Sequence, residues 1–433
     1  MWSQNWEATS DKRYQGAVNG AFLPSYSLGA DMANKDLKWE TTITRNIGVD
    51  FGFFNSRLTG TIDAYWNTTK DLLMKTAIPG ITGFTSTYAN VGQTSNKGIE
   101  IALQGVLVKT RDWNVTAGFN INFNRGKVDK LADNVTGLYG TEWATSSTFP
   151  KSDYVLKEGR PVGLVRGLTA DGFYTTDDFT YENGVYTLKE GVADVSSAVF
   201  PNYHLHNGMN ERPAGQLAYP GMAKFKDLND DGIINDDDVD VIGDMTPVHT
   251  GGFNINATYK NFDLGLYFNW SYGNEIYNVN KLAALYGYKE GAVYENKLSI
   301  VKDCYKIYDV VNGELVALTT PEQLNAANAN AKLPLAYSEN GYVSTLGIED
   351  GSYLRLNTLT LGYTLPKSML QKAGISNLRV YGSIYNVFTI TGYSGIDAEV
   401  STSTSTKTYP QLGMDWGTYP RARSFVLGVN LSF

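Results

Sequence analysis

Apolar and polar residues alternate one for one along several stretches of this chain, and the clearest stretch is the last ten residues. One face of the strand that this pattern predicts carries Phe425, Leu427, Val429, Leu431 and Phe433, and the other carries Ser424, Gly428, Asn430 and Ser432. A polar face, an apolar face and a terminal aromatic residue are typical of a transmembrane β-strand. The last strand of a soluble sandwich would also alternate, so this segment alone leaves both classes open.

The same period of two recurs in pairs of segments joined by short turns, each of which predicts a β-hairpin. The four pairs are 47–53 with 58–66, 99–103 with 113–123, 253–257 with 262–270, and 353–364 with 378–388. A short helix over 367–373 is expected to connect the last pair. With the final segment, the pattern predicts nine antiparallel strands.

Long polar connections separate these hairpins, at about 71–96, 126–248, 275–350 and 390–420. Transmembrane barrels have short turns on the periplasmic side and long loops outside, whereas a sandwich has no reason to place every long connection at one end. Because bacterial single-chain barrels have even strand numbers, nine strands are expected to be part of a barrel rather than a whole one. Residues 1–38 would then be the remnant of an extracellular loop.

Composition is consistent with a barrel. The 433 residues include 29 Tyr, 18 Phe and 8 Trp, yet no stretch approaches the roughly 20 consecutive apolar residues of a membrane helix. The net charge of -8, without a run of Lys and Arg, argues against nucleic acid as a partner. Cys304 is the single cysteine, which excludes an internal disulfide framework. The first residues lack an export signal, so we expect the chain to be truncated at its front.

One acidic segment, residues 227–238, has the spacing of an EF-hand-like calcium loop, with Gly232 at the sharp turn. Calcium prefers six to eight oxygen ligands, supplied by positions 1, 3, 5, 7, 9 and 12 of such a loop. Here those ligands would be Asp227, Asn229, Asp231, the Ile233 carbonyl, Asn235 and Asp238. The sequence therefore predicts a structural Ca²⁺ within the long loop 126–248, although a solvated acidic turn would show the same residues.

The sequence shows only weak signals of an enzyme active site. His204 and His206 alternate but have no supporting Glu or Cys at a metal-ligand spacing, and Asp177 and Asp178 have no fixed partner across a sugar. We expect no enzyme and no catalytic residue. Aromatic residues of the long loops are better candidates for ligand contact, because their rings can stack on sugars, although packing in the loops or in the membrane girdle would explain most of them. They are Tyr139, Trp143, Tyr154, Tyr203, Tyr219, Tyr286, Tyr288, Tyr393 and Trp416.

Four segments resemble those that recur in SusC/RagA-type TonB-dependent transporters, in the order that the family has them. They are Leu37-Lys38-Trp39-Glu40-Thr41-Thr42, Asn96-Lys97-Gly98-Ile99-Glu100, the stretch from Ser352 to Tyr363, and Tyr419-Pro420-Arg421-Ala422-Arg423-Ser424. The resemblance implies an all-β fold: an antiparallel transmembrane β-barrel segment with long extracellular loops. It would supply about nine C-terminal strands of a plugged barrel of roughly 22, with residues 39–433 as the barrel portion.

The resemblance also implies a function and partners. It implies TonB-dependent import of glycans or peptides through the cell outer membrane, with oligosaccharides favoured, together with a SusD-like surface lipoprotein. The TonB complex would act through an N-terminal region that is missing here, as the plug is. Two other classes stay open at this point. One is a soluble or surface β-rich calcium-binding, carbohydrate-binding protein, and the other is a secreted hydrolase.

Overall fold

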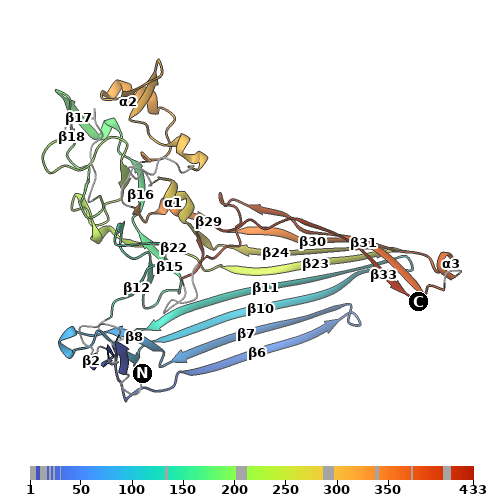
Figure 1. The fold of residues 1–433 in the computed structure, drawn as a ribbon. Coiled ribbons are helices and arrows are strands. Elements are labelled where there is room, and N and C mark those ends of the chain that lie inside the picture. Colours follow the sequence, from blue (N-terminus) through green and yellow to red (C-terminus); the bar gives the residue numbers. More distant parts are fainter. Residues whose placement is uncertain are drawn as a thin grey trace.

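The computed structural model describes residues 6–9, 17–18, 21–22, 25–29, 31–131, 135–200, 212–285, 297–336, 341–371, 374–402 and 411–433. Its main element is one nine-stranded antiparallel sheet in the order β33-β31-β30-β24-β23-β11-β10-β7-β6 (Figure 1). The strands are β6 (Thr41–Phe53), β7 (Leu58–Lys70), β10 (Gln93–Lys109), β11 (Trp113–Lys130), β23 (His249–Tyr259), β24 (Phe262–Tyr272), β30 (Tyr353–Thr364), β31 (Asn377–Thr391) and β33 (Ser424–Ser432). The nine predicted strands and four hairpins are confirmed.

The register of the sheet sorts side chains onto two faces, because residues paired across neighbouring antiparallel strands point the same way. On one face Ile101 pairs with Ile62 and with Ile121. On the other face Glu100 pairs with Asp63 and with Asn122. Within the described residues no second layer covers the apolar face, so that Leu427 is 88% exposed. A soluble sandwich would bury such residues between two sheets, and the sandwich alternative is therefore wrong.

Aromatic side chains gather at both ends of the apolar face. Near the short turns, the rings of Trp113 and Tyr259 lie 4.4 Å apart. Near the long connections, His249 stacks on Tyr272 at 5.0 Å and lies 5.4 Å from the ring of Phe123. The 11 residues of β23 join these two bands. At ~3.4 Å per residue and a tilt of ~40°, they span roughly 26 Å along a barrel axis, close to the ~25 Å apolar band of membrane barrels.

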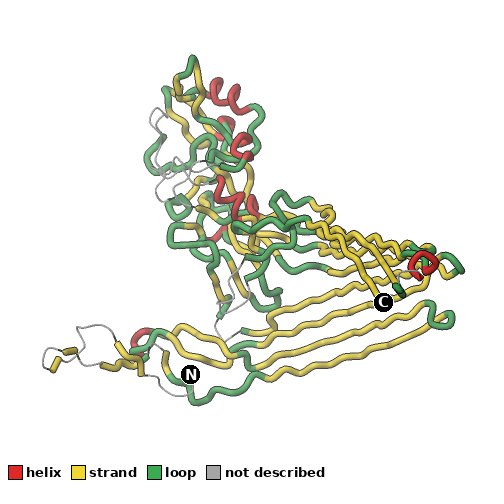
Figure 2. Tube along the Cα trace, turned by 45° about the vertical axis from the view of Figure 1, so that its right-hand side comes forward, coloured by secondary structure: helices red, strands yellow, loops and turns green. Residues whose placement is uncertain are grey.

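The two ends of the sheet differ in the length of their connections (Figure 2). The turn end has short links, including the turn at Phe54, Asn55 and Ser56, all three with positive φ, and the link that contains α3 (Lys367–Leu370). Helix α3 is shorter than the predicted 367–373, of which 372–373 lie outside the described residues. All the long connections lie at the opposite end, as predicted.

We call the described parts of 131–248, 273–352 and 392–423 the loop module (Figure 1). Its largest sheet joins β12 (Leu138–Gly140), β14 (Tyr154–Leu156), β15 (Leu164–Gly167) and β22 (Asp240–Asp244), and a second joins β29 (Ile348–Asp350), β25 (Glu275–Asn278) and β32 (Met414–Asp415). Its strand pairs are β13 (Thr148–Phe149) with β28 (Gly341–Tyr342), β16 (Ala170–Phe173) with β20 (Ala223–Phe225), β17 (Phe179–Glu182) with β18 (Val185–Leu188), β19 (Asp194–Val195) with β21 (Ile233–Ile234), and β26 (Tyr308–Val311) with β27 (Glu314–Ala317). Its α-helices are α1 (Val279–Leu285) and α2 (Pro321–Asn328).

Short strands also lie near the N-terminus, at the loop end of the sheet. They are β1 (Trp6–Thr9), β2 (Ala17–Val18), β3 (Ala21–Phe22), β4 (Ser25–Leu28), β5 (Asp31–Met32), β8 (Leu73–Ala77) and β9 (Ser86–Asn90). β5 pairs with β9, which ties the described part of 1–38 to the connection after β7. No helix in the described residues is long and apolar enough to cross a bilayer.

The loop module has a hydrophobic core of its own, which the sequence pattern did not predict. Tyr174, Tyr186, Tyr219 and Tyr277 are fully buried in it, and Cys304 packs in the same cluster. The prediction of irregular polar connections was therefore incomplete. The physical reason is that the core is assembled from strands of two to five residues, which are too short to show an apolar period.

Candidate functional site

The polar face of the sheet is rich in amide and hydroxyl side chains. Tyr65 donates its hydroxyl to Asn124 Oδ1 at 2.9 Å, and Asn357 donates to Asn269 Oδ1 at 2.5 Å. Asp63 and Glu100 lie directly opposite each other in the register and add negative charge. Such a wall exchanges hydrogen bonds with water and with polar solutes and offers little apolar surface.

A cleft of about 520 Å³ lies where the polar face meets the loop module. Asn96 and Asn124 line it from the polar face, Leu73 from β8, and Leu156 and Leu412 from the module. Its other lining residues are Glu40, Leu72, Met74, Val91, Gly92, Thr94, Ser95, Gly126, Lys127, Val128, Lys130, Leu131, Val162 and Thr246. We call it the mouth cleft. A volume within the ~300–1,000 Å³ of small-molecule sites, with mixed apolar and polar walls, suits a ligand of modest size.

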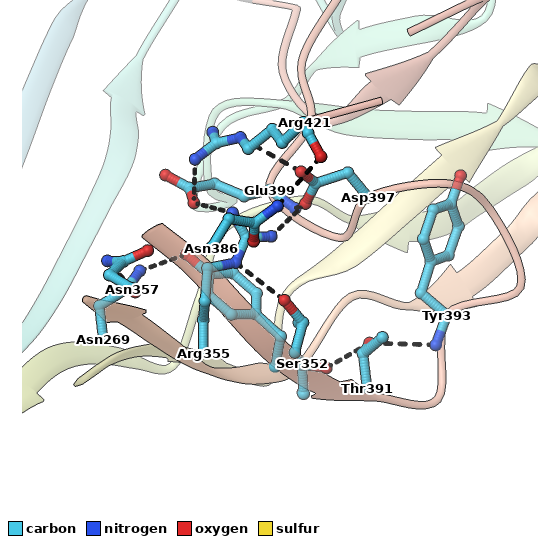
Figure 3. A network of polar contacts seen from close by, with 12 residues as sticks. Asn269, Ser352, Arg355, Asn357, Asn386, Thr391, Tyr393, Asp397, Glu399 and Arg421 are labelled. Atoms are coloured by element: carbon cyan, nitrogen blue, oxygen red, sulfur yellow. Dashed lines mark hydrogen bonds and ion pairs between the residues drawn. The ribbon is translucent and has the colours of Figure 1, made fainter. Parts of the chain in front are cut away.

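A network of charged residues fastens the last long connection to the sheet, and we call it the arginine clip (Figure 3). Arg355 of β30 is 2% exposed. Its Nε–H donates to Thr389 Oγ1 at 3.0 Å, an Nη1–H donates to Glu399 at 3.1 Å, and an Nη2–H donates to Asp397. Arg421 pairs with the same two carboxylates at 3.0 and 3.2 Å. The clip therefore joins β30 and β31 to the start of the segment after β31 and to the residues just before β33.

Sequence reasoning missed the clip, although it quoted Arg421 within the segment that carried the family resemblance. The alternating acids Asp397 and Glu399 were a further signal, because residues two apart on an extended chain point the same way. Pairing them with Arg355, more than 40 positions upstream, requires the folded chain.

The predicted calcium loop forms a tight, well-bonded turn. Asp227 Oδ2 accepts the backbone N–H of Gly232 at 2.7 Å, and Asp231 Oδ1 accepts that of Ile233 at 2.9 Å. Gly232 has a φ of +83°, which explains why glycine stands there. Asp238 is fully buried and accepts from the backbone N–H groups of Leu228 and Asn235.

All six predicted ligands, Asp227, Asn229, Asp231, Ile233, Asn235 and Asp238, lie in one compact loop that includes β21. Hydrogen bonds among them include Asn229 Nδ2 to Asp231 and Asn235 Nδ2 to the Ile233 carbonyl. Within the described ranges, no group of three or more His, Cys, Asp or Glu side chains converges as a metal site. Amide and carbonyl oxygens would have to complete the set, and calcium binding stays a prediction.

The other candidate residues are scattered. Tyr154, Tyr219 and Tyr393 are buried in the module, so packing accounts for these three candidates rather than ligand contact. Trp143 packs against the module core, whereas Tyr139 and Trp416 are about half exposed. Tyr203, His204, His206, Tyr286 and Tyr288 lie outside the described residues. Asp177 is exposed, while Asp178 pairs with Lys224 at 2.7 Å, which marks it as a structural group.

Two carboxyl groups, one buried and one partly buried, show how the module core is held together. Burial raises the pKa of Asp153, against the opposing effect of backbone N–H groups that Glu142, Trp143 and Ala144 donate to it. Burial also acts to raise the pKa of Asp178, but the hydrogen bonds from Lys224 and Thr175, together with the charge of Lys224, outweigh it, and the net pKa is lowered. Both carboxylates hold neighbouring chain segments together through these hydrogen bonds, so a structural role accounts for their shifted pKa values.

Comparisons with known proteins agree with this architecture. Residues 2–210 match the family model described as TonB dependent receptor-like, beta-barrel. TonB-dependent receptor P3 of Formosa agariphila is 30% identical over 96% of this chain and 36% of its own length. TonB-dependent receptor SusC of Bacteroides thetaiotaomicron is 29% identical over 92% of this chain and 32% of its own length. The chain thus spans about a third of the length of these relatives.

A solved structure described as the RagAB peptide importer in the closed-closed state shares the fold. Its TM-score is 0.69 at 24% identity, and the match covers 100% of this chain and 38% of that one. The polar face of our sheet corresponds to the inner wall of such a barrel, and the apolar face, with its two aromatic bands, to the lipid-facing surface. The chain belongs to the TonB-dependent receptor β-barrel family of the outer membrane, as a barrel portion of the SusC/RagA type.

Proposed function

We propose that this chain forms part of an importer that carries glycans or peptides across the outer membrane, with energy from TonB. The observation that carries the proposal is the continuity of the mouth cleft with the polar inner wall, since Asn96 and Asn124 belong to both. A solute bound under the loop module would lie at the entrance of a polar passage. TonB would act through a region outside these residues.

We propose a SusD-like surface lipoprotein as the partner on the extracellular side. The support is the similarity to SusC, and to a structure whose description names the RagAB pair as a peptide importer. The loop module rises from the loop end of the sheet, which is the side where such a protein would dock (Figure 2).

Uptake in cells tests the proposal. Deleting the gene should abolish uptake of labelled oligosaccharides or peptides, and replacing Leu412 by Trp should reduce it because the larger side chain fills the mouth cleft. Ile396→Trp is the matched control, since Ile396 is exposed in the same connection and does not line the cleft. Unchanged uptake of every probe after deletion would contradict the proposed function. Co-purification of a lipoprotein with the tagged protein tests the partner.

We also propose that the loop 227–238 binds Ca²⁺ in a structural role. The loop folds with positive φ at Asp230 and Gly232, and Ile234 inserts into the module core with no exposure. Carboxylates gathered in one turn repel one another unless a cation or hydrogen bonds offset their charge. A bound ion would therefore stabilise the turn and the core around Ile234.

Calorimetric titration with Ca²⁺ alone tests this site, with chelation by EGTA as the reverse experiment. The double change Asp227→Ala, Asp231→Ala should abolish binding and increase protease cleavage in the module. The matched control is Asp236→Ala, Asp237→Ala, which removes two exposed carboxylates at non-ligand positions of the same loop. Equal binding by both double variants would contradict the assignment.

A further inference from the structure

A second cleft, of about 440 Å³, lies in the loop module and shares no residue with the mouth cleft. It is lined by Ser146, Ser147, Thr148, Phe149, Pro150, Lys151, Ser152, Arg166, Ser197, Ala198, Val199 and Asp236. Five of these twelve residues carry a hydroxyl group, and three are charged. Both large apolar side chains, Phe149 and Val199, are buried in the module core. The cleft therefore offers hydrogen bonds and charge rather than an apolar wall.

Arg166 is the central charged group of this cleft. Its Nη1 donates to Ser152 Oγ at 2.8 Å, and its guanidinium lies 4.7 Å from the ring centre of Tyr139. Burial lowers the pKa of Arg166, so the folded protein holds its charge at a cost. Among the described residues, Arg166 takes part in no ion pair, although Asp236 lies close enough to act on it electrostatically.

A partly buried guanidinium with few partners favours an anion. Arginine has five N–H donors arranged in a fork that matches a carboxylate or a sulfate group. Lys151, which is exposed, adds a second positive charge to the same cleft, against the single carboxylate of Asp236. The net charge of the lining is therefore +1, in a protein whose overall charge is -8.

We propose that this cleft binds an acidic oligosaccharide, with the guanidinium of Arg166 pairing with a carboxylate or sulfate group of the sugar. The hydroxyls of Ser146, Ser147 and Ser197 donate to and accept from sugar hydroxyls, and Asp236 accepts from them. A peptide would require apolar pockets for its side chains, which this lining lacks. The inference rests on the proposed function and narrows the substrate to glycans that carry negative charge.

The test is calorimetric binding to the complete detergent-solubilised transporter that contains this chain. The probes are trigalacturonate, a sulfated galactose tetrasaccharide, neutral galactotriose and tetra-aspartate. We expect one or both acidic sugars to bind at least tenfold more tightly than galactotriose, with the preference shrinking at high salt. Which acidic sugar binds distinguishes a carboxylate from a sulfate ligand.

Variants locate the site. Arg166→Gln should remove the preference for acidic sugars, Arg166→Lys should keep part of it, and Arg160→Gln should leave it unchanged because Arg160 is exposed and outside the cleft. Slow thiol labelling of the buried Cys304 reports that each variant is folded. Wild-type preference in Arg166→Gln, equal binding of neutral and acidic sugars, or tighter binding of tetra-aspartate would each overturn the proposal.

Uptake separates this inference from the proposed function. If wild-type cells import galactotriose and trigalacturonate equally and Arg166→Gln changes neither, the cleft proposal fails while import stands. If wild-type cells import no probe and the deletion has no phenotype on glycans or peptides, the proposed function fails.

Discussion

Replacing Arg355 by Met tests whether the arginine clip holds the last long connection in place. The guanidinium of Arg355 is almost completely removed from water and has three partners, Thr389, Asp397 and Glu399. Met keeps most of the side-chain length but removes the charge and every donor. Asp397 would then remain buried, and among the described residues its cation partner would be the half-exposed Arg421.

The magnitude follows from burial. Removing one partner of a buried ion pair leaves an uncompensated charge and costs about 3–5 kcal/mol, whereas an exposed ion pair contributes about 0–1 kcal/mol. Arg421 makes two ion pairs with the same acids, at 3.0 and 3.2 Å, but lies in contact with solvent. We therefore expect Arg355→Met to destabilise the protein by several kcal/mol and Arg421→Met by no more than about 1 kcal/mol.

Thermal unfolding of the purified protein in detergent, combined with limited proteolysis, measures both effects. Cleavage by proteinase K, mapped by mass spectrometry, should appear between residues 392 and 402 in Arg355→Met before the strands of the sheet are cut. The double variant Arg355→Met, Asp397→Asn should recover part of the loss, because the stranded charge is removed with its partner. Arg423→Met is the control, since Arg423 is exposed and bonds to the backbone carbonyl of Asn386.

The test is which of the two arginine substitutions destabilises the protein more. If Arg421→Met proved more harmful than Arg355→Met, burial would not govern the energy of the clip. If neither change altered cleavage after residue 392, the clip would not be what fastens the connection.

Three further outcomes are expected. Burial, together with the charge of Asp303, raises the pKa of the Cys304 thiol to about 11, so Ellman's reagent at pH 8 should label it only after unfolding; rapid labelling of folded protein would show an open core. Because the pKa of Asp178 is lowered in the folded protein, its ion pair with Lys224 stabilises the module at pH values above the unfolded pKa, and this contribution is lost as the pH falls through the folded pKa. Near-UV circular dichroism should therefore show that Lys224→Met unfolds in acid at a higher pH than wild type. A Cβ at Gly98 would clash with the ring of Tyr65, so Gly98→Val should destabilise the protein by about 1–3 kcal/mol through overpacking and lower the heat resistance of the barrel on gels. Gly105→Val in the same strand is the control, because a Cβ there would meet only ordinary van der Waals contacts.

The nine strands could be predicted because each one carries its own signal. In β33 the side chains from Phe425 to Leu431 alternate between two environments, and a period of two needs no knowledge of distant residues. The same pattern restricts the register that the structure shows, since a shift by one residue would place Asp63 on the apolar face. The turn between Lys260 and Asn261 was equally local, with Lys260 at positive φ.

The fold of the loop module could not be predicted from such a local pattern. Its four-stranded sheet pairs β15 with β22, whose residues Leu164 and Asp244 stand 80 positions apart, and each strand is no longer than five residues. A tyrosine in a polar stretch gives no sign of whether its ring is buried, and for this reason the buried Tyr154 and Tyr219 stand among the loop aromatics that the sequence offers as candidates. The six residues of the predicted calcium loop could be singled out from the sequence because such a loop has a fixed local spacing, and calcium binding itself stays a prediction.

The arginine clip suggests why the resembling segment Tyr419-Pro420-Arg421-Ala422-Arg423-Ser424 has the composition it does. Arg421 bonds through its side chain to Asp397 and Glu399, and its backbone carbonyl accepts from Asn386 Nδ2 at 3.0 Å. Asn386 has a φ of +53° and lies where the register of β31 shifts, so the shift turns its amide towards the incoming chain. These contacts fix where the chain enters β33, and hence the register that places Phe425 opposite Ile384. The segment therefore helps to fix the register of the last strand, which an alternating pattern alone does not determine.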